Sequence, residues 1–306
     1  MVRRDRLDAA AIAVLTLLCA LWGVQQVAIK VAVHGGLPPV LQGAIRSAGA
    51  ALLGALWLAA RKGGAGLIVT LRQPGALAPG IAIAVLFGLE FVLIYLGLKF
   101  TTASRSVLLL ATAPFFTALG VHLLVPQERL GAVQALGLVI AFAGVAAALA
   151  DGLVHRSGNP FGDLLCGLGA VLWAATTIVI KSAKALRAVP ATALLLYQLG
   201  GSAPVLFAGS LLLGELAAPV HATPLAWAAL FYQTAIVAFA SYLVWFWLVQ
   251  TYPAARLAGF TFLSPMFGIM ASGLLLGEPI SAGLYVGLTA VAIGLRLVNR
   301  KAPARA

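Results

Sequence analysis

Four ionisable side chains, Lys30, Arg46, Glu90 and Lys181, stand within long apolar segments of the chain. A charge at such a position is costly, so it marks either a solute pathway or a packed ion pair. Glu90 is the most informative of the four, because no other carboxylate lies in the interior of an apolar segment. A carboxylate can bind an ammonium group or carry a proton, and a cationic side chain can attract a carboxylate. These residue types therefore indicate a site for a small charged solute.

Aromatic, amide and hydroxyl side chains recur at helical spacing around these charges. Phe87, Glu90, Phe91 and Tyr95, for example, share one face of a helix. Aromatics with a few polar groups are the usual lining of a small-molecule site. The residues that we expect to contact a substrate are Trp22, Gln25, Gln26, Arg46, Phe87, Glu90, Phe91, Tyr95, Trp173, Thr177, Tyr242 and Trp245.

One ten-residue pattern occurs twice. LWGVQQVAIK, which begins at Leu21, returns 151 positions later as LWAATTIVIK. The same offset relates Pro114 to Pro265, and both prolines are candidates for a kink or a gate because proline breaks helix hydrogen bonding. A long repeat inside an apolar chain is a feature of secondary transporters. It divides the chain into two halves, residues 1–150 and residues 151–306.

One position breaks the symmetry of the repeat. Glu90 corresponds to Ser241 at the same offset, so the carboxylate belongs to the first half alone. A symmetric scaffold that carries one asymmetric charge is what a directional site needs.

The composition identifies an integral membrane protein, because 62% of the 306 residues are apolar and only 9% are charged. Runs of roughly twenty apolar residues, enough to cross a bilayer as helix, recur along the chain. Boundaries at Gly, Pro and charges predict ten spans: Ala9–Val33, Val40–Ala60, Ala76–Leu98, Ala103–Leu124, Ala132–Ala150, Gly162–Ala185, Ala191–Leu213, Leu225–Leu248, Ala254–Leu276 and Ile280–Val298.

The formal net charge of +12 reflects membrane topology and not nucleic-acid binding. Basic residues gather at the N-terminus, in the loops after even-numbered spans and at the C-terminus, whereas the other loops hold only Lys99, Arg105 and Arg156. The positive-inside rule then places both termini in the cytoplasm. With five spans in each half, the second half is expected to insert inverted relative to the first.

The order of short motifs resembles the EamA module of the drug/metabolite transporter superfamily. These motifs are WG in the first span, Pro39 before the second, TTAS leading to Pro114, and a loop glutamate followed by a glycine-bearing helix, and they recur in the second half. The resemblance covers nearly the whole chain. It implies ten helices around a central cavity in a bacterial inner membrane, and export of amino acids, other metabolites or drugs without ATP hydrolysis.

The leading hypothesis is a secondary transporter that exports a small amphipathic metabolite, most simply an amino acid with an apolar or aromatic side chain. Arg46 or Lys30 would attract its carboxylate, and Glu90 its ammonium group or a proton. The alternatives are a proton-coupled exporter of cationic drugs and, from another class, a non-transporting membrane scaffold. Lys30 and Lys181 could instead reach the interface, and Arg46 could form a permanent ion pair with Glu90.

Signals for other chemistry are missing from the sequence. No G-x-x-x-x-G-K-[ST] loop is present, and the four histidines lack metal-ligand spacing. We therefore expect no enzyme activity, no cofactor and no metal, and a protein that functions as a monomer with a small-molecule substrate in the lipid bilayer. Glycines seven residues apart predict close helix packing, within the bundle or between protomers; they are Gly137, Gly144, Gly287 and Gly294.

Overall fold

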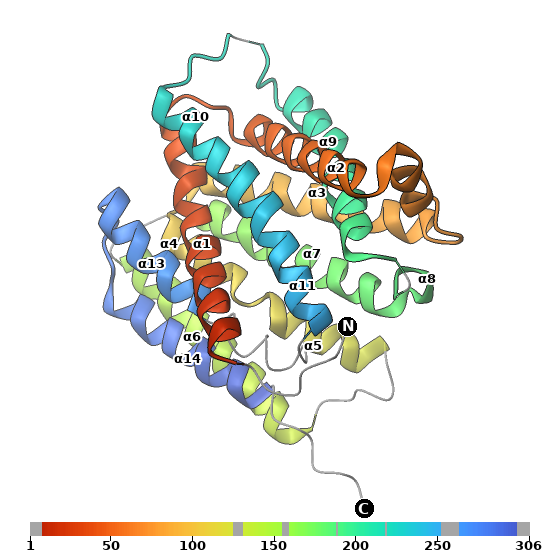
Figure 1. Cartoon of the computed structure of the whole chain (residues 1–306). Helices are drawn as coiled ribbons and strands as arrows, with labels where there is room; N and C mark the ends of the chain where they lie inside the picture. Colours follow the sequence, from red (N-terminus) through yellow and green to blue (C-terminus); the bar gives the residue numbers. More distant parts are fainter. Residues whose placement is uncertain are drawn as a thin grey trace, which may run out of the picture.

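The computed structural model describes residues 8–124, 131–154, 159–187, 189–217, 219–251 and 263–298, and within them the chain is helical and contains no strand (Figure 1). The helices are α1 (Ala9–His34), α2 (Pro39–Leu71), α3 (Leu77–Phe100), α4 (Ala103–Leu110), α5 (Ala113–Leu124), α6 (Ala132–Val154), α7 (Pro160–Ser182), α8 (Lys184–Arg187), α9 (Ala191–Leu212), α10 (Pro224–Phe231), the π-helix η2 (Tyr232–Ser241), α11 (Tyr242–Thr251), α13 (Leu263–Leu276) and α14 (Ala282–Val298).

Six of the described helical stretches are long and apolar enough to cross a membrane. They are Ala9–His34, Pro39–Val69, Leu77–Phe100, Pro160–Ile180, Ala191–Leu212 and Pro224–Trp245. Shorter apolar helices accompany them at Leu263–Leu276 and Ala282–Gly294. The chain is thus a multi-pass helical membrane protein.

The repeat is visible in how α1 and α7 begin. Asp8 accepts a hydrogen bond from the Ala11 amide at 2.8 Å, and Asn159, which lies 151 positions later, accepts one from the Phe161 amide at 2.9 Å. Each side chain satisfies an amide that the first helical turn leaves without a backbone partner. The two halves therefore start their first helices with the same device.

The second helix is longer than the sequence indicates. α2 continues past the expected end at Ala60 to Leu71, with a break at Gly63, where φ is 71°. Glycine adopts this left-handed conformation without the steric cost of a Cβ. Arg61 and Lys62 precede this break, and apolar residues follow it. The predicted span ended before these two cations, so the helical segment after the break was not expected.

The expected fourth span, Ala103–Leu124, is two helices. The chain turns at Ala111 and Thr112, and the Thr112 amide bonds to the Leu109 carbonyl at 3.0 Å. Pro114 follows as the second residue of α5 and has no amide hydrogen to donate to Leu110, so a continuous helix would lose a bond here.

The eighth span also differs from expectation, because it contains η2 between α10 and α11, which local sequence does not indicate. The expected start of the ninth span at Ala254 lies outside the described residues, and the rest of that span is present as α13, which carries the buried Pro265.

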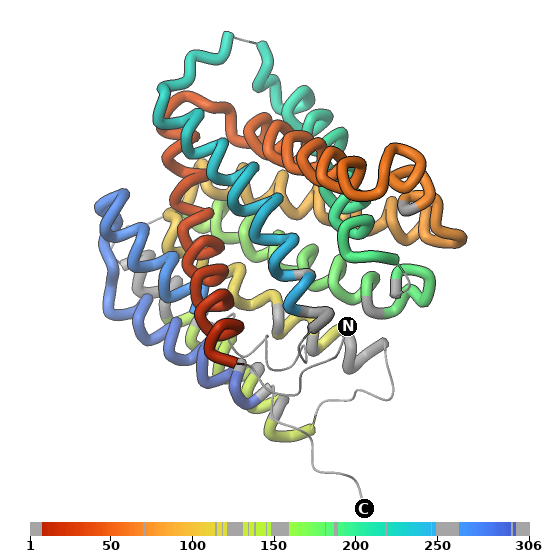
Figure 2. Tube along the Cα trace, in the orientation of Figure 1, coloured from red at the N-terminus to blue at the C-terminus, as the bar shows by residue number. Residues whose placement is uncertain are grey.

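The main helix contacts join the two halves of the chain. α6 packs along α14, α3 along α7, α2 along α9 and α1 along α13, so segments of different colour lie side by side (Figure 2). A Cβ at Gly144 would lie 2.1 Å from that of Ala290, and one at Gly294 would lie 2.4 Å from the Gly137 carbonyl oxygen. The spaced glycines thus serve packing within the bundle, where small residues allow close approach.

Candidate functional site

Arg46 is the largest fully buried side chain with a charge. It lies two turns into α2 and has no exposed surface. Its Cζ lies 4.2 Å from the centroid of the Phe91 ring, and its Nη2 donates to the Tyr242 hydroxyl at 3.5 Å. Its Nε and Nη1 have no hydrogen-bond partner. An aromatic face and a phenol therefore hold the guanidinium, and two of its three nitrogen atoms remain without a hydrogen-bond partner.

Glu90 on α3 is the second buried charge. The residue is 2% exposed, and its Oε2 has no hydrogen-bond partner. Within the described residues, no ion pair of 4.0 Å or less joins Glu90 to Arg46. The permanent ion pair that the sequence left open is absent, and both groups keep unused hydrogen-bonding capacity.

A chain of hydrogen bonds beside these charges links both halves of the protein. The Tyr95 hydroxyl donates to Gln233 Oε1 at 2.8 Å, Gln233 Nε2 donates to Gln42 Oε1 at 3.1 Å, and Gln42 Nε2 donates to the Ile29 carbonyl at 3.4 Å. Gln42 and Gln233 were not among the residues expected to contact a substrate. Their signal was an amide inside an apolar segment, the same signal that singled out Gln25 and Gln26.

The expected aromatic lining is partly assembled. The ring centroids of Phe87 and Phe91 are 4.7 Å apart, and those of Phe91 and Tyr95 are 5.8 Å apart. These rings form one continuous surface along α3. It lies next to Arg46 through the contact with Phe91.

Trp22 on α1 meets the second half of the chain. Its indole Nε1 donates to the Ser241 hydroxyl at 2.8 Å, and its ring centroid lies 5.2 Å from that of Trp245. Ser241 in turn donates to the Val237 carbonyl, one turn earlier in η2. The π-helix therefore places polar groups at both ends, Gln233 toward α2 and α3 and Ser241 toward α1.

Trp173 on α7 is 47% exposed. It follows Val171 by two residues, or roughly 200° around the helix axis, so it lies nearly opposite the exposed face that Leu164, Leu168 and Val171 form. Thr177, one turn later on the same side, is partly exposed. The side chains of Lys181 and Pro114 lie outside the described residues.

Lys30 does not join Arg46 or Glu90. Its Nζ donates to the Thr101 carbonyl and lies 3.7 Å from Glu278 Oε1. Lys30 is instead part of a separate polar cluster at one end of the bundle. Its side chain is 14% exposed, so Lys30 is largely enclosed in this cluster.

Glu278 is the centre of that cluster. Its carboxylate accepts the amides of Ala103 at 2.8 Å and Ser104 at 3.0 Å, so it caps the N-terminus of α4 from the other half of the chain. The Ser104 hydroxyl adds a bond to Glu278 at 2.8 Å and contacts the Ser272 hydroxyl. Anionic groups are stabilising at a helix N-terminus.

Further contacts at the same end also join the halves. Glu215 accepts the amides of Val40 at 3.0 Å and Leu41 at 2.8 Å at the start of α2. Arg105 pairs with Asp163 through Nε at 3.0 Å and through Nη2. We call the carboxylate contacts of Glu278, Glu215 and Asp163 the inter-half clasp, because each bonds groups of the first half from the second. In the described residues, no group of three or more His, Cys, Asp or Glu side chains is placed to hold a metal ion.

Membrane helices in two related halves, with buried polar groups between them, define a multi-pass membrane transporter. The EamA-like transporter family matches the chain twice, at residues 9–150 and 160–300. The chain belongs to this family.

Two related proteins and one solved structure are similar to this chain. "Uncharacterized transporter YvbV" of Bacillus subtilis (strain 168) is 30% identical over 178 residues, which are 58% of this chain and 57% of that protein. A protein of Escherichia coli (strain K12) named "Probable amino-acid metabolite efflux pump" is 26% identical over 290 residues and 91% of each chain. A solved crystal structure covers 94% of this chain and 97% of its own, with a TM-score of 0.64 and 20% identity, and shows the same fold.

Proposed function

We propose that the protein exports amino acids with apolar or aromatic side chains. The observation that carries this proposal is the burial of Arg46 and Glu90, which have opposite charges and unused hydrogen-bonding atoms. Buried polar groups normally have partners, because an unpartnered one is costly. An amino acid supplies both missing partners: its carboxylate for Arg46 and its ammonium group for Glu90. The rings of Phe87, Phe91 and Tyr95 provide apolar contact.

The comparisons support an amino-acid substrate over a cationic drug. Relatives that align over 91% of this chain are named for amino-acid metabolite efflux. A bound cation would neutralise Glu90 but would leave Arg46 without a counter-ion. The cationic-drug alternative is therefore kept as an outcome of the test.

The proposed architecture is ten membrane spans in two inverted halves, residues 1–150 and 151–306, with both termini on the cytoplasmic side of a bacterial inner membrane. The helix contacts support it, because they persist when each helix is exchanged for its repeat counterpart. In the repeat, α1 corresponds to α7, α2 to α9, α3 to the span that contains α10 and η2, and the span of α4 and α5 to that of α13. The contact of α1 with α10 and η2 thus matches that of α7 with α3, and the contact of α1 with α13 matches that of α7 with α4 and α5. The contact of α2 with η2 likewise matches that of α9 with α3.

The proposed mechanism is alternating access, and the described conformation fits a state closed on the outer side. The inter-half clasp lies at the end where α1 finishes and α2, α4 and α7 begin, which is the outer end in this topology. Trp173, which is 47% exposed, lies just past the midpoint of α7 when counted from the clasp end. Opening would then require release of the clasp, with Pro114 and Pro265 as candidate hinges.

Uptake into proteoliposomes tests the substrate class. Vesicles that hold the purified protein would be offered labelled aromatic and aliphatic amino acids, with and without an imposed pH gradient, beside protein-free vesicles. We expect saturable uptake of one apolar class. Absence of uptake for every amino acid in tight vesicles would reject the proposal, and cationic dyes would then be the next panel.

A further inference from the structure

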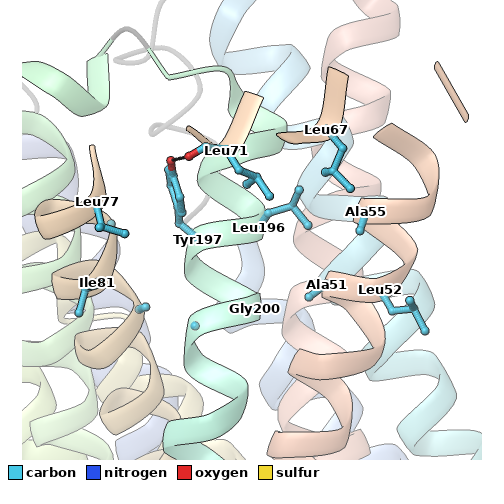
Figure 3. A pocket seen from close by; sticks show the side chains of 13 residues that line it. Ala51, Leu52, Ala55, Leu67, Leu71, Leu77, Ile81, Leu196, Tyr197 and Gly200 are labelled. Atoms are coloured by element: carbon cyan, nitrogen blue, oxygen red, sulfur yellow. Dashed lines mark hydrogen bonds between the residues drawn. The ribbon is translucent and has the colours of Figure 1, made fainter. Parts of the chain in front are cut away.

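An apolar cavity opens between α2, α3 and α9, away from the buried charges. It has a volume of about 560 Å³, and Figure 3 shows leucine side chains and Tyr197 around it. Its lining includes Leu52, Leu67, Leu77, Ile81, Leu196 and Tyr197. None of the residues of the Arg46 and Glu90 site lines it. Pockets of roughly 300–1,000 Å³ hold one small or elongated ligand.

The segment of α2 after the break at Gly63 borders this cavity. Leu67 and Leu71 face into it, whereas Ile68 and Val69 are 52% and 67% exposed on the outside. The Tyr197 hydroxyl donates to the Leu71 carbonyl and so fastens the segment to α9 (Figure 3). This short segment therefore lines the cavity with one side and presents apolar side chains on the other.

Cations flank this segment at both ends. Arg61 and Lys62 precede it, Arg72 follows Leu71 directly, and all three are exposed. The Arg61 Cζ lies 4.3 Å from the centroid of the Trp57 ring, and tryptophan is enriched at membrane interfaces. The sequence between Asp8 and Glu90 contains no aspartate or glutamate, so these cations have no carboxylate near them in the sequence.

We propose that this cavity binds one acyl chain of an anionic glycerophospholipid, with the phosphate held by Arg61, Lys62 and Arg72. The apolar lining suits the chain, and the three cations flank the α2 segment that borders the cavity. Basic residues near a membrane surface attract anionic lipids, with a gain of about fivefold in affinity for each residue. A phosphatidylcholine of the same chain length lacks the net negative charge and should bind more weakly. The inference does not depend on the transported substrate.

Native mass spectrometry of the purified full chain tests this site. The protein would be mixed with phosphatidylglycerol or with phosphatidylcholine of identical acyl chains, and the retained lipid counted. We expect phosphatidylglycerol to be retained at least tenfold better. Equal retention of the two lipids by the unaltered protein would overturn the proposal.

Two kinds of variant separate the headgroup from the chain. Changing Arg61, Lys62 and Arg72 together to Gln should abolish the preference, whereas Arg296→Gln, an exposed cation at the end of α14, should keep it. A Cβ at Gly200 would meet only Ala51, at 3.8 Å, so Gly200→Leu should extend into the cavity and lower retention of both lipids at least threefold. Size-exclusion profiles and helical circular dichroism would confirm folding.

Two results would reject the assignment. A triple variant that retains phosphatidylglycerol as well as the Arg296→Gln control would show that these cations do not hold the headgroup. Displacement of bound lipid by free leucine or phenylalanine would assign the cavity to a transported solute.

Discussion

The indole Nε1 of Trp22 donates to the Ser241 hydroxyl at 2.8 Å and joins the first helix of one half to the other half of the protein. Trp173 lies 151 positions after Trp22, and Glu90 lies 151 positions before Ser241. Trp173 and Glu90 are therefore the equivalent pair in the repeat. Glu90 Oε2 has no hydrogen-bond partner, and Trp173 is 47% exposed. Trp22 thus has a hydrogen bond to its repeat-related partner, whereas the equivalent bond from Trp173 to Glu90 is not formed. In an inverted repeat that alternates between two states, the halves exchange conformations, so the opposite state should form the bond from Trp173 to Glu90.

The two tryptophans should therefore control the conformational equilibrium in opposite directions. Trp22→Phe removes a bond of the described state, and Trp173→Phe removes a bond of the other state. Each change should shift the equilibrium about fivefold, since a hydrogen bond contributes about 1 kcal/mol. The measurement is the rate at which an impermeant maleimide labels Ala103→Cys, a buried position at the clasp, after Cys19 and Cys166 are replaced by Ala.

We expect faster labelling with Trp22→Phe and slower labelling with Trp173→Phe. Shifts in the same direction would mean that the substitutions only loosen packing.

The inter-half clasp should hold the outer end closed. Glu278→Gln removes the charge that caps α4 and pairs with Lys30, and hydrogen bonds to charged groups contribute about 1.5–3 kcal/mol. The same Ala103→Cys reporter should then react at least tenfold faster. Glu278→Asp keeps the charge and serves as the control. Unchanged labelling in Glu278→Gln would show that the carboxylate does not close this end.

The packing of α6 on α14 should be intolerant of larger residues. Gly144→Leu would force atoms against Ala290, and overpacking costs about 1–3 kcal/mol or more. Thermal unfolding followed by circular dichroism should show a lower midpoint for Gly144→Leu than for Ala147→Leu, which alters an exposed position of the same helix. Equal midpoints would contradict the close approach of these helices.

The sequence predicted the helices and the buried charges better than it predicted their partners. Glu90 and Arg46 stood out because a charge in an apolar segment is rare, and that signal is local. The π-helix that presents Gln233 and Ser241 depends on packing with α1, α2 and α3, so periodicity does not reveal it. The pairing of Lys30 with Glu278 joins residues far apart in the chain, and only the fold brings them together.

The repeat offset carried more information than any single motif. It related Trp22 to Trp173 and Glu90 to Ser241 before any geometry was known. Its limit is that it compares positions and not environments. The conformation alone shows that Trp22 is hydrogen-bonded and that Trp173 is about half exposed.

Competition by substrate analogues tests the central claim most directly. In vesicles that take up labelled leucine or phenylalanine, the matching amide lacks the carboxylate and the matching deaminated acid lacks the ammonium group. Both should compete at least tenfold more weakly than the amino acid, because each leaves one buried charge unpaired. Arg46→Gln should remove the penalty for the amide alone, and Glu90→Gln should remove the penalty for the deaminated acid alone. If both analogues compete as well as the amino acid, or if neither variant changes their ranking, Arg46 and Glu90 do not bind the two ends of the substrate.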